Sequence, residues 1–283
     1  MTTTCERFIE WAQTEPSIRM VTLIGSRSRP EGAPDGPTEH SDWDFQVATS
    51  DPAMFATPDW LSAINGQPIA YVKRLGVTGV VDKVTAIFPD GDVEWVIIPA
   101  EAFDGFVQAA PGVDDAHPMV QKMFVELGKV LFGDYRVVKG GDDCVAVYEA
   151  ASRLGADAYR LSDDQVVAVA EGFVCDYVAV RRKTARGELH TAQLLLHEQL
   201  MSALYSLLFE LRKREGLHAK PQARRLEELD DPRLPLLDIA PRLDRASLTE
   251  AADKAAHALR VMVGDLVGAR WSWPDLAGVY LGD

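Results

Sequence analysis

The sequence predicts an α+β protein in which a mixed sheet flanked by helices is followed by a helical bundle. In the first half, short apolar or alternating runs are separated by turns rich in Gly and Pro, a pattern typical of strands. From about Asp143 the chain becomes rich in Ala, Leu and Val with helical periodicity. A chain of 283 residues can hold two mid-sized domains. We expect them to be 1–140 and 141–283, because Gly140-Gly141 is a flexible pair before the change in composition.

The first half contains the expected sheet. Its strand candidates are 18–24, 42–48, 69–74, 83–88 and 93–98. The last two flank the turn sequence Pro89-Asp90-Gly91-Asp92, which predicts a hairpin. We expect helices after Thr4, over 52–64 and from Pro99 to Val107.

The second half contains the expected bundle. Ser162 can cap a helix that runs to about Arg186. A second helix is expected from Glu188 to Glu215 with its end at Gly216, and a third over 247–267. Residues 110–143 carry no clear pattern.

Composition excludes several classes of protein. The 43 acidic residues outnumber the 29 Lys and Arg residues, which gives a formal charge of −14. This charge repels phosphate backbones, so we expect no nucleic-acid partner, and it favours cationic ones. Three widely spaced cysteines, with no signal-peptide pattern, fit a reducing cytoplasm. No apolar stretch approaches the roughly 18 residues of a membrane helix, so we expect no membrane partner.

Five polar or small residues form the most informative pattern. Gly25-Ser26 ends the first strand, where a glycine lets the backbone approach a ligand and the serine can contact phosphate oxygens. Asp42 and Asp44 are two residues apart on the next strand and therefore point to one face. Glu94 is a lone acid in a later apolar strand, where a carboxylate is costly unless it is paired, exposed or metal-bound.

If these carboxylates share one site, a cation is expected there. At about 5 Å and an effective dielectric constant of about 20, each pair of carboxylates repels by about 3 kcal/mol. Oxygen-only ligands favour Mg²⁺. Mg²⁺ beside a phosphate-binding turn is typical of phosphoryl or nucleotidyl transfer, and Arg27 in the same turn can neutralise phosphate charge.

The order Gly25-Ser26, Asp42-Trp43-Asp44 and then a lone acid on a later strand resembles the nucleotidyltransferase (polymerase-β-like) superfamily. Within it, the sequence is most similar to the aminoglycoside 6-adenylyltransferases of the streptomycin adenylyltransferase type. The positions that carry this resemblance also include Arg27, Pro30, Phe88 to Gly91, Pro99, Phe173, Cys175, Tyr177, Arg186, Glu188, Leu189, Ala192 and Lys220. Glu94 stands where an aspartate is more usual.

The resemblance implies an antibiotic-resistance enzyme that uses ATP and Mg²⁺. It would transfer AMP to a hydroxyl of a small cationic acceptor, an aminoglycoside, and release pyrophosphate. The helical half would form the acceptor side of a cleft. The implied metal ligands are Asp42, Asp44 and Glu94, and the implied nucleotide contacts are Gly25, Ser26, Arg27 and Lys220. Acceptor contacts would come from Glu94, Asp176 and Glu188, with Glu94 or Glu188 as the base.

Other interpretations fit the same residues. Asp42 and Asp44 can be a solvated strand edge, Glu188 a glutamate favoured at a helix N-terminus, and Lys220 a surface lysine. The protein can also be a non-catalytic module that binds a nucleotide or small molecule on the same scaffold. A third hypothesis is an enzyme that nucleotidylates a protein.

Overall fold

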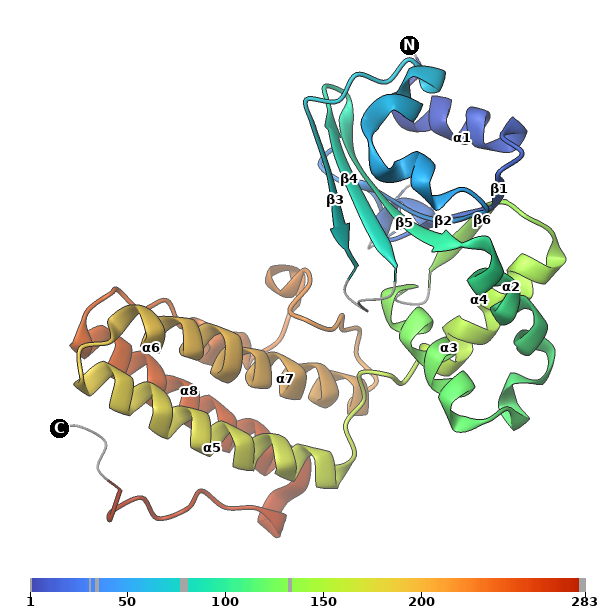
Figure 1. The fold of residues 1–283 in the computed structure, drawn as a ribbon. Helices are drawn as coiled ribbons and strands as arrows, with labels where there is room; N and C mark the ends of the chain where they lie inside the picture. The colour runs from blue at the N-terminus through green and yellow to red at the C-terminus, as the bar shows by residue number, and fades with distance from the viewer. Residues whose placement is uncertain (1, 31, 34–35, 77–80, 132–133, 280–283) are drawn as a thin grey trace. The chain divides into compact units, whose positions relative to one another are not determined.

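The computed structural model describes residues 2–30, 32–33, 36–76, 81–131 and 134–279. The chain divides into two compact units, Met1–Ala158 and Tyr159–Asp283 (Figure 1). The first unit contains a mixed sheet with helices, and the second is helical. The α+β class predicted from the sequence is therefore confirmed.

Six strands form one sheet within the described residues of the first unit. They are β1 (Ile18–Ile24), β2 (Trp43–Thr49), β3 (Ala70–Leu75), β4 (Asp82–Phe88), β5 (Gly91–Pro99) and β6 (Tyr135–Lys139). Their order is β3-β4-β5-β2-β1-β6. The β2–β5 pairing is parallel, and the other pairings described are antiparallel. The hairpin expected at Pro89 to Asp92 is the β4–β5 pair.

One face of the sheet packs on aromatic side chains beneath α1 (Thr4–Thr14) and the 3₁₀ segments η2 (Pro52–Ala56) and η3 (Pro58–Ile64). Phe8 of α1 contacts Phe45, Trp60 and Trp95, with ring centroids 4.9, 6.0 and 5.5 Å away. All four side chains are buried. This cluster fixes one face of β2 and β5 and leaves their polar residues on the other.

The start of α1 differs by one residue from the prediction. Thr3, rather than Thr4, is the N-cap, and it forms a capping box with Glu6. The backbone N–H of Thr4 instead donates to Asp90 Oδ2 at 2.6 Å, and its hydroxyl donates to Oδ1 at 3.0 Å. These bonds tie the helix to the β4–β5 turn.

The opposite face is covered over β1, β2 and part of β5 by three helices. They are α2 (Ala100–Ala109), α3 (Pro118–Leu131) and α4 (Asp142–Gly155), with the short η4 (Ala110–Asp115) between the first two. Phe103, Phe124 and Tyr148 form the centre of this second core. Tyr148 donates a 2.7 Å hydrogen bond to Gln46 of β2 inside it.

The domain boundary lies beyond α4, not at Gly140-Gly141. Because α3 and α4 pack glycine against glycine, a Cβ on Gly155 would lie only 2.5 Å from the Cα of Gly128. This close approach makes α4 part of the first unit. The boundary between the two units therefore lies later than the predicted limits 1–140 and 141–283. The helical composition begins at α4, but α4 still packs with the first unit.

The second unit is built from long helices. They are α5 (Asp163–Ala185), α6 (Leu189–Leu195), α7 (Ser202–Arg214) and α8 (Arg245–Val267), and they enclose one apolar core. The single helix expected over 188–215 is α6 and α7 joined by a π-helical segment, Leu196–Met201. Short 3₁₀ turns occur at Leu226–Glu228, Leu234–Leu237 and Gly268–Arg270. In the part of the chain that is described, no helix is both long and apolar enough to cross a bilayer.

Candidate metal centre

Asp42, Asp44 and Glu94 come together on the sheet face opposite the aromatic core. One carboxylate oxygen from each lies within 4.8 Å of the others. The cause is the parallel pairing of β2 with β5, in which Asp44 is the register partner of Glu94. Asp42 immediately precedes β2 and lies two residues before Asp44, which brings it to the same side. The convergence expected from the sequence is present.

Trp43 and Phe45, which alternate with the two aspartates, face the other way. Phe45 is buried in the aromatic core, and Trp43 stacks on it with ring centroids 6.0 Å apart. Burial of these rings fixes the register of the strand, because a slip by one residue would turn the carboxylates into the core. Packing on one face therefore sets the position of Asp42 and Asp44 on the other.

Gly25 brings the end of β1 into contact with Asp44. Its φ is +73°, and a Cβ at this position would lie 2.5 Å from Asp44 Oδ2. Only glycine allows both the backbone angle and the approach. The short 3₁₀ helix Ser26–Ser28 begins here, and the first N–H groups of such a turn lack partners within it. Donors of this kind suit an anion next to the carboxylates.

Arg27 contacts the backbone that leads into the site. Its Nε donates to the carbonyl oxygens of Ser41 at 2.8 Å and Asp42 at 3.1 Å, and its Nη2 donates to Ser41 O at 2.6 Å. Its guanidinium carbon also lies 4.6 Å from the Trp43 ring centroid. These contacts position Asp42. The phosphate contact expected of Arg27 stays a prediction.

Two side chains of β4 contact Glu94, and sequence reasoning did not identify either. Lys83 forms an ion pair with Glu94 Oε2. The hydroxyl of Thr85 donates to Glu94 Oε1 at 3.2 Å. The alternation of the β4 sequence, which buries Val84 and Ala86, places Lys83 and Thr85 on the site face. The alternation in β4 is visible in the sequence, but the contact with Glu94 could be predicted only from the register of β4 with β5.

The three carboxylates repel one another strongly enough to shift a pKa. Burial, followed by the charges of Asp42 and Glu94, raises the pKa of Asp44 to about 7, although the charge of Lys83 acts in the opposite direction. Near neutral pH the site therefore attracts a proton or a cation. Asp44 and Glu94 are half-buried and Asp42 is exposed, and this all-oxygen cluster beside the Gly25 turn fits a hard divalent cation such as Mg²⁺.

The remaining predicted residues belong to the second unit. Glu188 precedes α6 and forms ion pairs with Lys183 at 2.5 Å and Arg186 at 2.9 Å, and the hydrogen bond from Lys183 lowers its pKa. Asp176 on α5 is half-buried, and burial raises its pKa. Lys220 lies after α7. The base, acceptor and nucleotide roles of these three residues stay predictions.

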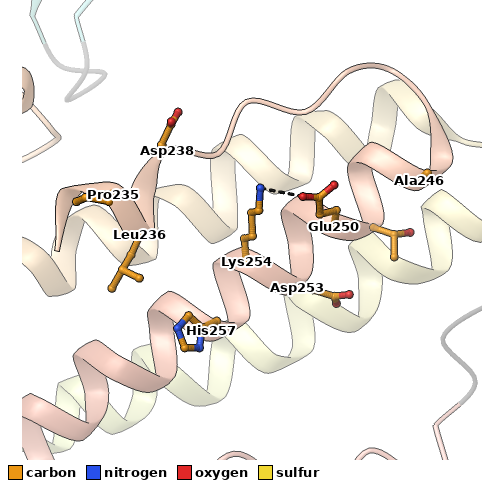
Figure 2. Close-up of a pocket in the computed structure, with 9 residues that line it drawn as sticks. Pro235, Leu236, Asp238, Ala246, Glu250, Asp253, Lys254 and His257 are labelled. Carbon is orange, nitrogen blue, oxygen red and sulfur yellow. Dashed lines mark ion pairs between the residues drawn. The ribbon is translucent and has the colours of Figure 1, made fainter.

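A hollow of about 820 Å³ also lies in the second unit, beside α8 (Figure 2). It is lined by Pro235, Leu236, Asp238, Ala246, Thr249, Glu250, Asp253, Lys254 and His257. Glu250 and Lys254 form an ion pair at 2.9 Å, and Asp253 accepts hydrogen bonds from Tyr177 and Arg181. Much of its charge is thus neutralised internally, and no predicted site residue lines it. The carboxylate cluster is the stronger candidate.

No protein-family model matches the chain, and no curated protein matches it. Among solved structures, the chain is similar to an aminoglycoside 6-adenyltransferase from Bacillus subtilis, at 15% identity and a TM-score of 0.38 over 97% of this chain and 94% of that one. It is also similar to a nucleotidyltransferase-like protein from Exiguobacterium sibiricum 255-15, at 14% identity and a TM-score of 0.35 over 93% and 74%. Superpositions this loose do not identify an activity, so the proposed function depends on the geometry of the carboxylates.

Proposed function

We propose that the protein is a nucleotidyltransferase that transfers AMP from ATP to a hydroxyl group of a small molecule and releases pyrophosphate. The observation that carries this proposal is the convergence of Asp42, Asp44 and Glu94 beside the Gly25 turn. A cation site next to a glycine turn at the start of a short 3₁₀ helix suits a metal-bound triphosphate.

The three carboxylates would hold Mg²⁺ through oxygen atoms alone. Bound there, Mg²⁺ would supply electrostatic stabilisation of the charge that develops on the phosphate oxygens. The first N–H groups of the Ser26 turn would donate to phosphate oxygens on the β1 side of Asp44. Arg27 would keep Asp42 in position through its bonds to the backbone of Ser41 and Asp42.

The reaction is a displacement at the α-phosphorus. The acceptor hydroxyl oxygen forms a bond to this phosphorus, and the bond from phosphorus to the bridging oxygen of the β-phosphate breaks. Pyrophosphate leaves with the electron pair of that bond. The hydroxyl proton passes to a carboxylate or to solvent. Glu94 and Glu188 remain the two candidates for the base, and Glu188 is engaged by Lys183 and Arg186.

The acceptor is proposed as a polyhydroxylated small molecule. An aminoglycoside is the acceptor that the sequence resemblance implies, and the formal charge of −14 is compatible with attraction of a polycation over long range. This acceptor class is tested together with the activity.

The experiment is incubation with Mg²⁺ and ATP and a panel of hydroxylated acceptors, with release of pyrophosphate as the measurement. Asp44→Asn should lower the rate by at least about 100-fold, because it removes a metal ligand. Asp82→Asn is the matched control, since Asp82 lies on β4 of the same sheet but pairs with Lys73 at 2.8 Å. Equal rates for both variants would contradict the proposal. ATP binding without turnover of any acceptor would favour the non-catalytic binding module.

A further inference from the structure

The carboxylates belong to a row of side chains that crosses the sheet. Asp44 of β2 is opposite Glu94 of β5, which is opposite Thr85 of β4, which is opposite Val72 of β3. Residues directly opposite one another in a sheet share a face. Val72 and Thr85 therefore extend the metal site toward the β3 edge of the sheet.

Two cations lie side by side in the next row. Arg74 of β3 is the register partner of Lys83 of β4, so their side chains leave the same face as Glu94. Lys83 is held by Glu94. Arg74 is exposed, and among the described residues no ion pair or hydrogen bond engages it. Like charges directly opposite one another destabilise a sheet. Arg74 and Lys83 therefore lower the stability of the β3–β4 pairing unless an anion binds between them.

Among the described residues of the first unit, the helices of the second core do not pack on this part of the face. The second core, built from α2, α3 and α4, includes side chains of β1, β2, β6 and the end of β5, and none from the described residues of β3 or β4. Val72 is 37% exposed, and Ile87, on the same face of β4, is 41% exposed. A basic and partly apolar surface thus adjoins the carboxylates, in a chain whose formal charge is −14.

We propose that Arg74 and Lys83 bind an anionic group, a phosphate or a carboxylate, of the acceptor. This inference rests on the proposed function. In a displacement at phosphorus, the attacking and leaving oxygens are roughly in line. The Gly25 turn lies on the β1 side of Asp44, and Lys83 and Arg74 lie on the β4 and β3 side. With the triphosphate at the turn, the attacking hydroxyl comes from the side of the two cations.

The consequence concerns substrate class. Arg74, which no described carboxylate pairs, and the adjacent Lys83 can attract an oxyanion by charge-assisted hydrogen bonds, and a cationic acceptor group makes no use of them. The acceptor is therefore a hydroxylated molecule that carries a phosphate or carboxylate, such as a sugar phosphate, rather than an aminoglycoside. Charges on an edge strand can also serve only to prevent aggregation, and the experiment separates that role from binding.

The experiment follows inorganic phosphate binding by NMR, through the backbone amides of β3 and β4 and the Nε–H of Arg74. The protein is first saturated with Mg²⁺ and a non-hydrolysable ATP analogue, and binding of that analogue tests the proposed function separately. Phosphate should then give saturable shifts, and Arg74→Ala should weaken its affinity about fivefold or more. Arg136→Ala is the matched control, because Arg136 is an exposed arginine on the other edge strand, β6.

Three other outcomes overturn the inference. Equal phosphate affinities of the wild type and Arg74→Ala would show that Arg74 binds no anion. Equal weakening by Arg136→Ala would show a general charge effect. The third outcome is that phosphate shifts the NMR signals of the free protein but not those of the protein saturated with the nucleotide analogue. In that case Arg74 and Lys83 bind the phosphates of the nucleotide and not the acceptor. If the analogue does not bind, the titration of the free protein still decides whether Arg74 and Lys83 hold phosphate.

A final arm uses matched acceptors in the pyrophosphate assay. Glucose 6-phosphate should be used with a lower KM than glucose. Arg74→Ala should remove most of this difference in KM, whereas the control Arg136→Ala should leave it unchanged. Turnover of a polycationic aminoglycoside with a KM that Arg74→Ala lowers would contradict the proposed substrate class.

Discussion

Asp44 and Glu94 face each other across β2 and β5, the one parallel pair among the described strands. Their carboxylates share a side of the sheet with Asp42, and one oxygen of each lies within 4.8 Å of the others. Aromatic packing on the opposite face fixes this register, so the folded chain holds like charges together that would separate in the unfolded chain. The burial of Asp44 and this repulsion are the source of the first two predictions.

The metal-free protein should lose stability as the pH rises from about 4 to about 7. Burial and the neighbouring acids raise the pKa of Asp44 from 3.8 to about 7, so the folded state binds a proton that the unfolded state releases. The stabilisation is complete below the unfolded pKa and is lost as the pH passes the folded one, and about 2 kcal/mol of this loss falls between pH 5.5 and pH 8. Thermal melting in EDTA at pH 5.5 and pH 8 measures it. Asp44→Asn should flatten this dependence, and a variant that keeps the wild-type slope would show another group to be responsible.

Metal affinity should follow the same proton. Because a cation competes with the proton on Asp44, the affinity for Mn²⁺, used as a probe for Mg²⁺, should fall by about tenfold for each pH unit below about 7. Titration of Mn²⁺ by electron paramagnetic resonance between pH 5 and pH 8 measures this. An affinity independent of pH over this range would contradict the assignment of Asp44 as a ligand.

Gly25→Ala should impair the site without unfolding the protein. The new Cβ would lie 2.5 Å from Asp44 Oδ2, which forces the turn or the carboxylate to move. Gly32→Ala provides a matched control, since Gly32 also has a positive φ, +79°, but has nothing within 4 Å of its added Cβ. Both variants should lose about 1 kcal/mol of stability from backbone strain. Only Gly25→Ala should weaken Mn²⁺ binding, by about tenfold or more, and equal binding in both variants would rule out the steric explanation.

Glu210 should contribute strongly to the acid stability of the helical unit. Burial opposes its ionisation, but hydrogen bonds from Arg160 at 2.8 Å, from Arg214 at 2.8 Å and from the N–H of Leu161 at 2.9 Å together lower its pKa to about 2. Its contribution is therefore present above the unfolded pKa of 4.5 and is lost as the pH falls toward 2.

The matched pair of variants for this network is Glu210→Gln and Glu250→Gln. Glu210→Gln leaves two arginines without their shared carboxylate and should cost about 3 kcal/mol or more at pH 7. Glu250 forms an exposed pair with Lys254 on α8, and its substitution should cost at most about 0.5 kcal/mol. Urea unfolding measures both. Similar losses for the two variants would contradict the importance assigned to Glu210.

Much of the sheet could be predicted because a buried strand has a recognisable sequence, either a continuous apolar run or an alternation of apolar and polar residues. The run 18–24 is buried at nearly every position and coincides with β1, and the other four strand candidates agree with the structure to within about two residues. The spacing of Asp42 and Asp44 and the isolation of Glu94 were enough to predict their meeting. In each case a short stretch of sequence was enough: an apolar run, the two-residue spacing of a strand, or a single acid among apolar residues.

The missing features depend on contacts between distant segments. β6 pairs with β1 through register partners such as Tyr135 and Ile24, and nothing in its short sequence distinguishes an edge strand from a loop. The close approach of Gly128 and Gly155 decides that α4 joins the first unit, and it is visible only when the helices are packed. The ion pair of Lys83 with Glu94 likewise requires the β4–β5 register.

The central claim is that Asp42, Asp44 and Glu94 hold a divalent cation beneath a nucleotide. The most direct measurement is anomalous diffraction from crystals grown with Mn²⁺ and a non-hydrolysable ATP analogue. The predicted result is an anomalous peak within about 2.5 Å of an oxygen from each of the three carboxylates, with the triphosphate beside Gly25 and Ser26. A nucleotide bound elsewhere, or Mn²⁺ that contacts none of the three carboxylates, would contradict it.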